Sequence, residues 1–110
     1  MPHSLEAIET AVRRFHREQQ GHAPSDCLVT MNGDLLVVVT RDVFTPTEQA
    51  LLEQPEGRKL VSTARRELRS LTRDVIEPEI ARLARRPVVR SYYDLDVRVG
   101  EQIEVYVLGR

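Results

Sequence analysis

The stretch CLVTMNGDLLVVVT, residues 27–40, decides the fold that this sequence predicts. Its first six residues have the alternation of a strand, Asn32-Gly33 is a strong hairpin-turn signal, and residues 35–39 are apolar on both faces of the returning strand. A strand that is apolar on both faces is typical of the centre of a sheet, or of a face that a second subunit covers. The stretch therefore predicts a β-hairpin whose second strand is central.

An amphipathic helix is predicted before this hairpin. Ser4 is its expected N-cap and Gly21 its expected end. Spacings of three and four residues place on one face Leu5, Ile8, Val12 and Phe15. His16 on the same helix is expected at the surface, whereas Cys27 is expected to be a small core residue.

Two further helical segments are predicted after the hairpin. Thr45, Pro46 and Glu48 have the pattern of a capping box with proline in the first helical position. Pro55 ends that short helix, and the longer helix after it contains Pro78, which we expect either to kink the helix or to divide it. The buried face of the longer helix is expected to hold Leu60, Ala64, Leu68, Leu71, Val75, Ile76, Ile80 and Leu83.

A second hairpin closes the chain. Residues 89–97 alternate, Gly100 turns the chain, and the residues expected to face the core from the last strand are Ile103, Val105 and Val107. The order α-β-β-α (interrupted)-β-β predicts one two-layer α+β domain over residues 1–110. Its antiparallel four-stranded sheet would come from two hairpins and pack against the helices.

The face of the sheet away from the helices needs a cover of its own. We expect this face to be patchily apolar, through Tyr92, Tyr106, Leu36 and Val38. A homodimer is the simplest cover for such a face, so we expect two copies of the chain to associate.

The composition is that of one globular domain, with 110 residues of which 41% are hydrophobic and 30% charged. No apolar run approaches the roughly 20 residues of a membrane span, and the first residues lack the pattern of a secretory signal. The single cysteine cannot form an internal disulfide, and the three histidines do not cluster with it. We therefore expect a soluble cytoplasmic protein with neither a metal nor a cofactor.

Positive charge is concentrated in residues 58–86, which hold nine basic and four acidic side chains in a chain of net charge −1. Arg65, Arg69 and Arg73 are four residues apart and share one helical face. Such a stripe could bind an acidic protein, an anionic lipid or nucleic-acid phosphates, or it could be a solvated face paired with neighbouring carboxylates. The overall charge and the lack of aromatic residues in this segment disfavour nucleic acid.

Two further features are candidate sites, each with a structural alternative. Arg58 and Lys59 begin the long helix, whose exposed N–H groups attract anions, although a neighbouring glutamate and water could satisfy the same groups. Tyr92 and Asp94 are the strand residues that would face a ligand. Asp94 and Asp96, flanked on the same face by Arg90 and Arg98, also fit a cross-strand charge ladder.

No catalytic residues are predicted. The sequence has no serine elbow, no suggestive set of cysteine, histidine and acid, and no glycine-rich nucleotide loop. An enzyme would need a site assembled from residues far apart in the chain, visible as a deep cleft over Asp94 and Arg58. We therefore expect a protein that is not an enzyme.

Short motifs occur in a fixed order along nearly the whole chain. They are Gly21-His22-Ala23-Pro24, Asn32-Gly33-Asp34, Phe44-Thr45-Pro46-Thr47-Glu48, Gly57-Arg58-Lys59-Leu60-Val61 with Arg65 or Arg66 after it, Asp94, and Gly100-Glu101. This ordered set resembles the MpsC-like family, first catalogued as a domain of unknown function. The family takes its name from a cation-translocating, membrane-potential-generating system, whose other components are tied to respiration and inorganic-carbon supply.

The resemblance implies an accessory or regulatory protein and supplies neither a reaction nor catalytic residues. With the charge pattern it predicts docking to a membrane cation or inorganic-carbon transport system. The residues expected to carry that docking are Arg58, Lys59, Arg65, Arg69 and Arg73. The alternative is a nucleic-acid or anion-binding module that uses the same arginines.

Overall fold

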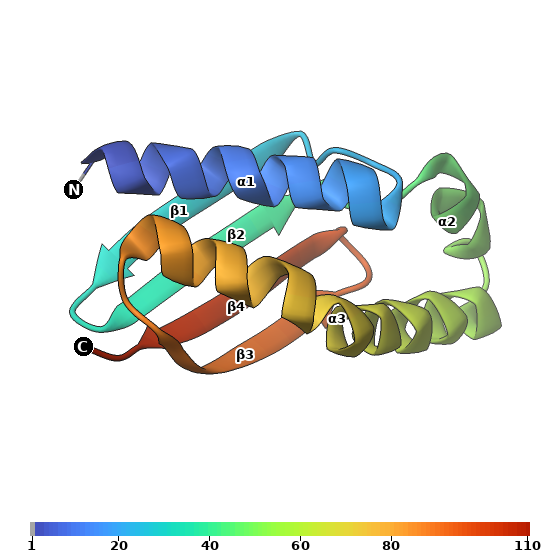
Figure 1. The fold of residues 1–110 in the computed structure, drawn as a ribbon. Coiled ribbons are helices and arrows are strands. Elements are labelled where there is room, and N and C mark those ends of the chain that lie inside the picture. Colours follow the sequence, from blue (N-terminus) through green and yellow to red (C-terminus); the bar gives the residue numbers. More distant parts are fainter. Residues whose placement is uncertain (1) are drawn as a thin grey trace.

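The computed structural model describes residues 2–110, with side chains from Leu5 onward. Its elements in chain order are α1 (Pro2–Gln20), β1 (Asp26–Asn32), β2 (Leu35–Arg41), α2 (Pro46–Leu51), α3 (Pro55–Ala84), β3 (Val88–Asp96) and β4 (Glu101–Leu108). In Figure 1, α1 and α3 lie across the front of the sheet, and α3 extends past the strands toward α2. Across residues 2–110, no helix combines the length and the hydropathy that a membrane span requires.

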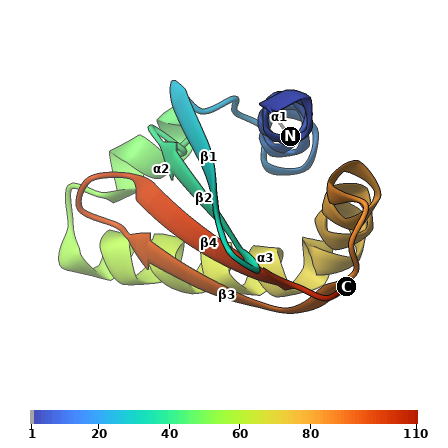
Figure 2. The ribbon, with the colours of Figure 1, turned by 90° about the vertical axis from the view of Figure 1, so that its left-hand side faces the viewer.

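The four strands form one antiparallel open sheet in the order β1-β2-β4-β3. β2 lies between β1 and β4, so the apolar residues 35–39 do belong to a central strand. Figure 2 shows α1 and the C-terminal half of α3 on the same side of the strands. The predicted fold class, an α+β fold with a four-stranded antiparallel sheet packed against helices, is confirmed.

The first hairpin turns one residue later than its sequence signal. Asn32 pairs with Leu35, so the two residues of the turn are Gly33 and Asp34. Gly33 has a φ of +60°, which suits the first position of a tight hairpin turn and which glycine adopts without steric cost. The hairpin itself is confirmed.

The predicted helix ends are only partly confirmed. α1 already begins at Pro2, two residues before the expected cap Ser4, whose side chain lies outside the described part of the chain. At the start of α2 the capping box is present: Glu48 N donates to Thr45 Oγ1 at 3.2 Å, and Thr45 N donates to Glu48 Oε1 at 2.9 Å. α3 runs through Pro78 as a single helix, so the proline does not divide it.

Two apolar clusters form the core between the helices and the sheet. The larger cluster contains Ile8, Val12, Cys27, Leu36, Val38, Ile76, Ile80, Tyr106 and Leu108. The smaller cluster lies against the first half of α3 and contains Val43, Phe44, Val61 and Leu95. Cys27 is therefore a core residue, as expected.

The buried face of α3 is not the one that its leucines predict. Leu60, Ala64, Leu71 and Val75 are exposed, and Leu68 and Leu83 are half-buried. The fully buried residues of α3 are instead Gly57, Val61, Arg65, Arg69, Thr72, Ile76 and Ile80, so the prediction holds for Ile76 and Ile80, and for Leu83, which packs against the larger cluster. The face is rotated because two arginines of α3 find buried partners, as described below.

The alternation of β4 is also opposite to the expectation. Its helix-facing residues are Gln102, Glu104, Tyr106 and Leu108, all buried, whereas Ile103, Val105 and Val107 lie on the other face. Tyr106, Leu36 and Val38, which were expected on the uncovered face, belong to the core. Tyr92 is exposed, as expected of a residue on the uncovered face.

Candidate functional site

A layer of buried polar side chains lies between the two apolar clusters. Along α3, Val61 of the smaller cluster is followed by Arg65 and Arg69, and then by Ile76 of the larger cluster. We use the name polar layer for the buried residues His16, Thr40, Arg65, Arg69, Gln102 and Glu104. The layer is the main concentration of polar chemistry inside the fold.

Arg65 is 2% exposed and joins four segments of the chain. Its Nε donates to Glu48 Oε2 at 2.7 Å and its Nη2 donates to Glu48 Oε1, so the pair is held by two parallel bonds. Nη1 donates to Gln20 Oε1 at 2.6 Å, and Nη2 donates to the carbonyl oxygen of Val43 at 2.6 Å. The guanidinium also stacks on Phe44, with Cζ 5.5 Å from the ring centroid. Arg65 thus links α3 to α1, to α2 and to the segment after β2.

Arg69 is 9% exposed and pairs with Glu104 of β4. Its Nε donates to Glu104 Oε2 at 2.9 Å, and its Nη2 donates to Ser91 Oγ at 2.9 Å. The Tyr106 hydroxyl donates to the same Glu104 oxygen at 2.9 Å, and Ser91 Oγ donates to Glu77 Oε2 at 2.6 Å. The charge of Arg69 is therefore compensated inside the protein.

The predicted arginine stripe is not one accessible surface. Arg65 and Arg69 are in the interior, which corrects the expectation that they lie along a surface next to the leucines. Arg73 is exposed, and its Nε donates to Glu77 Oε2 at 3.0 Å. Arg58 is half-buried, and its Nη1 donates to the carbonyl oxygen of Leu52, between α2 and α3, at 2.9 Å. Lys59 is exposed.

The two predicted strand residues also lie outside the polar layer. Tyr92 is exposed, and its hydroxyl accepts from Arg90 Nε at 3.3 Å. Asp94 is exposed and pairs with Arg66 of α3 at 3.0 Å and not with Arg90, whereas Asp96 of the expected charge ladder pairs with Arg98 at 3.2 Å. The Arg66 bond holds the pKa of Asp94 below its ordinary value. Neither residue bonds to Arg58 or Lys59 in the part of the chain that the structure describes.

Three residues in contact with the polar layer, Glu48, Tyr93 and Tyr106, have shifted pKa values. Burial by itself raises the pKa of Glu48, but the bonds from Arg65 and Thr45 outweigh it and leave the pKa below its ordinary value. Burial, followed by the nearby Glu104 charge, raises the pKa of Tyr93 to about 12 and that of Tyr106 well above its ordinary value. The Glu48 carboxylate and the two phenols are therefore not poised to exchange protons near pH 7.

His16 is buried at 1% exposure, which contradicts the expectation of a surface residue. Tyr93 hydroxyl donates to Gln102 Oε1 at 3.2 Å, so the Gln102 amide nitrogen, 3.3 Å from His16 Nε2, is left to donate to the ring. A proton on Nε2 would oppose that donor. Burial, and then the charge of Arg65, lower the pKa of His16 to about 4, so the ring is neutral at pH 7.

The neutral His16 predicts a loss of stability in mild acid. Its pKa is about 4 in the folded chain against 6.5 when exposed, so the unfolded state binds one more proton between these values. The free energy of unfolding is then expected to fall as the pH drops from 6.5 toward 4, by about 3 kcal/mol in total. Urea unfolding, followed by circular dichroism at several pH values between 7 and 4.5, measures this fall in the free energy of unfolding.

His16→Gln provides the comparison, because glutamine bonds but does not titrate. In this variant the free energy of unfolding is expected to lose most of its dependence on pH between 7 and 4.5. His22→Gln, at a half-buried position, is expected to keep that dependence. Glu48 and Glu77, with lowered pKa values, contribute only at lower pH. Equal slopes for the native chain and His16→Gln, or an NMR titration of the His16 ring near pH 6.5, would contradict the assignment.

The face of the sheet opposite the helices has an apolar centre surrounded by polar and charged residues. Its central residues are Leu28, Thr30, Leu35, Val37, Val39, Tyr92, Ile103, Val105 and Val107, which we call the open face. Val37 lies beside Val105, and Tyr92 follows on β3 between Arg90 and Asp94, so the apolar surface is continuous over β2 and β4 and reaches β3 at Tyr92. A continuous exposed apolar surface is typical of an interaction site.

Charged side chains border the open face at one end of the strands. Arg41 lies between Asp26 and Glu101 in the register, and it pairs with both at 2.8 Å. An apolar centre with a polar rim is the arrangement found in protein–protein interfaces.

The metal-ligating side chains and the single cysteine complete the description of the reactive groups. No three metal-ligating side chains gather among the described residues. Cys27 is buried, and burial raises the pKa of its thiol to about 11, so it is not a thiolate at neutral pH.

Comparison with known protein families assigns the chain to one of them. A family model described as "Na+-translocating membrane potential-generating system (MpsC)" matches residues 3–110. The chain belongs to the MpsC family. No curated protein and no solved structure matches it. The resemblance seen in the ordered motifs is therefore confirmed, and the MpsC name connects the chain to a membrane-potential-generating system.

Sequence reasoning missed two surfaces of this MpsC chain. It placed the apolar residues of β4 and the leucines of α3 in the core, although both are exposed or half-buried. The signal was present in the polar residues: Gln102 and Glu104 are two apart on a strand, and Arg65 and Arg69 are four apart on a helix. Each spacing puts both residues on one face, so oppositely charged faces of β4 and α3 could have been matched.

Proposed function

We propose that this chain is a non-catalytic accessory subunit of the membrane-potential-generating system named by its family, acting on the cytoplasmic side as a homodimer. The observation that carries the proposal is the open face, whose apolar surface is suited to contact with another protein chain. The corrected placement of Arg65 and Arg69 moves the expected contact from the arginines to apolar surfaces.

The size of the open face supports a second copy as its cover. Four strands spaced about 4.8 Å apart, with about six residues of about 3.3 Å each, give roughly 400 Å² of footprint. A stable interface covers about 800 Å² of accessible surface on each partner. The corrugated apolar centre supplies much of this area, and the charged rim extends it.

The rim also favours pairing of two copies. One end of the open face carries Asp26, Arg41 and Glu101, with an excess of negative charge, and Arg90 lies toward the opposite end of β3. A two-fold axis that runs across the strands would place the acidic end of one copy over the Arg90 end of the other. Such complementarity fixes the orientation of an interface more than its strength.

The buried ion pairs support a structural use of the arginines. Arg65 and Arg69 each have a carboxylate and further acceptors, so their charges stabilise the fold and are not offered to a substrate. The same placement weakens the alternative of a nucleic-acid or anion-binding module, because the two arginines that anchored it are not on the surface.

Val37→Lys tests the homodimer. It places a charge in the middle of the open face, where desolvating it in an interface is unfavourable. The native chain is expected to show twice the chain mass of 12.6 kDa in light scattering at micromolar concentration, and Val37→Lys the mass of one chain. Val99→Lys makes the same change at an exposed valine in the β3–β4 turn and is expected to leave the dimer intact.

The same variants test the subunit role in the native cell. Deleting the gene is expected to lower the sodium-dependent membrane potential, measured with a potential-sensitive dye. The native chain and Val99→Lys are expected to restore the potential, whereas Val37→Lys is not. An unchanged potential after deletion would contradict the accessory role, and a monomeric native chain would contradict the homodimer.

A further inference from the structure

The long helix α3 presents a second apolar surface that the fold does not use. Leu60, Ala64, Leu68, Leu71 and Val75, which we call the leucine stripe, follow one another at spacings of four, four, three and four residues. Leu71 is 71% exposed, more than any other large hydrophobic side chain that the structure describes. The stripe spans residues 60–75, whose fifteen steps of 1.5 Å make it about 22 Å long, or four turns of a partner helix.

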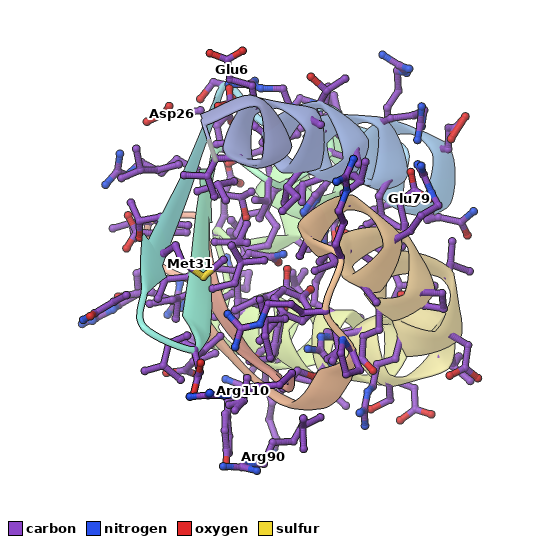
Figure 3. The ribbon with its side chains drawn as sticks, turned by 60° about the vertical axis from the view of Figure 1, so that its left-hand side comes forward. Glu6, Asp26, Met31, Glu79, Arg90 and Arg110 are labelled. Carbon is purple, nitrogen blue, oxygen red and sulfur yellow. The ribbon has the colours of Figure 1, made fainter. Side chains whose placement is uncertain are left out.

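The leucine stripe continues into a groove between α1 and α3. The groove has a volume of about 160 Å³, and its lining residues are Ala11, Arg14, Phe15, Glu18, Gln19, Val75, Ile76 and Glu79. Val75 belongs to both surfaces. Figure 3 labels Glu79, which lies between the two helices, where Arg14 Nη2 donates to its Oε1 at 3.4 Å. The charges at the groove are thus paired locally.

The outer border of the leucine stripe is acidic. Glu67 and Asp74 precede and follow Leu71 by four and three residues, so both lie beside it on the helix surface. Both are exposed, and neither forms an ion pair with a side chain that the structure describes. Arg66 and Arg73 lie on the opposite side of α3 and pair with Asp94 and Glu77.

We propose that the leucine stripe and the groove bind an amphipathic helix of another protein, whose apolar side is bordered by lysine or arginine. Helices lie in apolar grooves through anchors at three- and four-residue spacings, and a basic border would pair with Glu67 and Asp74. This deepens the proposed function, on which it rests, by naming the chemistry of the partner subunit's contact segment.

Two other occupants fit the charges less well. In an antiparallel pair of two α3 helices, equivalent borders face each other, so Glu67 and Asp74 would meet the same carboxylates of the second copy and repel them. An anionic membrane surface would be repelled by the same border. A basic helix is therefore the occupant that the border favours.

Peptide probes test the proposal with the full chain. The first probe is an 18-residue helical peptide with a leucine stripe bordered by lysines, and the second has the same leucines bordered by glutamates. Fluorescence anisotropy is expected to show the lysine-bordered peptide binding at least tenfold tighter. Equal binding of the two peptides, or binding of neither, would overturn the proposal.

Two sets of variants locate the binding. Leu71→Ser with Val75→Ser is expected to weaken binding of the lysine-bordered peptide at least tenfold. Val99→Ser, which changes an exposed valine outside the leucine stripe, is expected to leave the affinity unchanged. Glu67→Lys with Asp74→Lys is expected to reverse the preference toward the glutamate-bordered peptide. All changed side chains are exposed, so the melting temperature reports whether folding is intact. Unchanged affinity in either double variant would overturn the proposal.

The two proposals can fail separately. If deletion lowers the membrane potential but the lysine-bordered peptide does not bind, the accessory role stands and the helical partner is excluded. If the peptide binds with the expected preference but deletion leaves the potential unchanged, the binding surface stands and the proposed role of the chain does not.

Discussion

Replacing Arg69 with methionine is expected to lower the free energy of unfolding by about 3–5 kcal/mol, the usual cost of leaving one member of a buried ion pair alone. Methionine keeps much of the volume of the arginine stem, so the loss arises chiefly from Glu104, whose carboxylate stays buried without its cation. The Tyr106 hydroxyl continues to donate to Glu104, but a single neutral donor does not replace a guanidinium. Urea unfolding at pH 7 gives the difference.

Two comparisons separate the buried pair from a general effect of losing arginine. Arg73→Met, at an exposed position paired with Glu77, is expected to change the free energy of unfolding by no more than about 0.5 kcal/mol. Arg69→Met combined with Glu104→Gln is expected to recover at least half of the loss, because the stranded charge is gone. A double variant as unstable as Arg69→Met alone would show that packing, not the unpaired charge, is responsible.

Gly57→Ala is expected to destabilise the chain by about 3 kcal/mol, at the upper end for overpacking. A Cβ added at Gly57 would lie 1.7 Å from the carbonyl oxygen of Leu51 and 2.7 Å from its carbonyl carbon. The obstacle is backbone, so a side-chain rotation cannot relieve it, and α2 and α3 would have to move apart. Thermal and urea unfolding of the variant measure the effect.

Gly33→Ala is the matched glycine change. Gly33 has open space around it, so alanine there meets only the unfavourable backbone conformation at φ +60°, which costs about 1 kcal/mol. Gly57→Ala should therefore be clearly less stable than Gly33→Ala. If the two variants are equally stable, the approach of α3 to Leu51 does not constrain the fold.

Most of the architecture follows from local sequence signals. Turn chemistry, capping and periodicity all act within a few residues. They determine the hairpin around Gly33, the capping box of Thr45 and Glu48, and the helices α1 and α2 on either side of the hairpin. These signals were sufficient for the α+β class and for the order of the elements.

The face of α3 could not be predicted in the same way. Its sequence offers an apolar stripe through Leu60 and Leu71 and a mixed stripe through Arg65 and Arg69. Hydrophobicity favours the first, but the partners of the second, Glu48 and Glu104, lie 17 and 35 residues away in the chain. Only the tertiary structure brings these charges together. Because it buries Arg65 and Arg69, the candidate interaction surface of α3 becomes the apolar stripe through Leu60 and Leu71.

The four-residue spacing of Arg65, Arg69 and Arg73 makes α3 electrically periodic along its axis. If the helix advanced by four residues, about 6 Å, Arg69 would arrive opposite Glu48 and Arg73 opposite Glu104, while Arg65 would enter the place of Val61 in the smaller apolar cluster. Two ion pairs would form again, but the third guanidinium would be buried among apolar side chains. The same advance would bring Val61 into the place of Gly57, against the Leu51 carbonyl, where not even a Cβ fits. The close approach at Gly57 and the apolar place of Val61 thus both hold the helix in its present register.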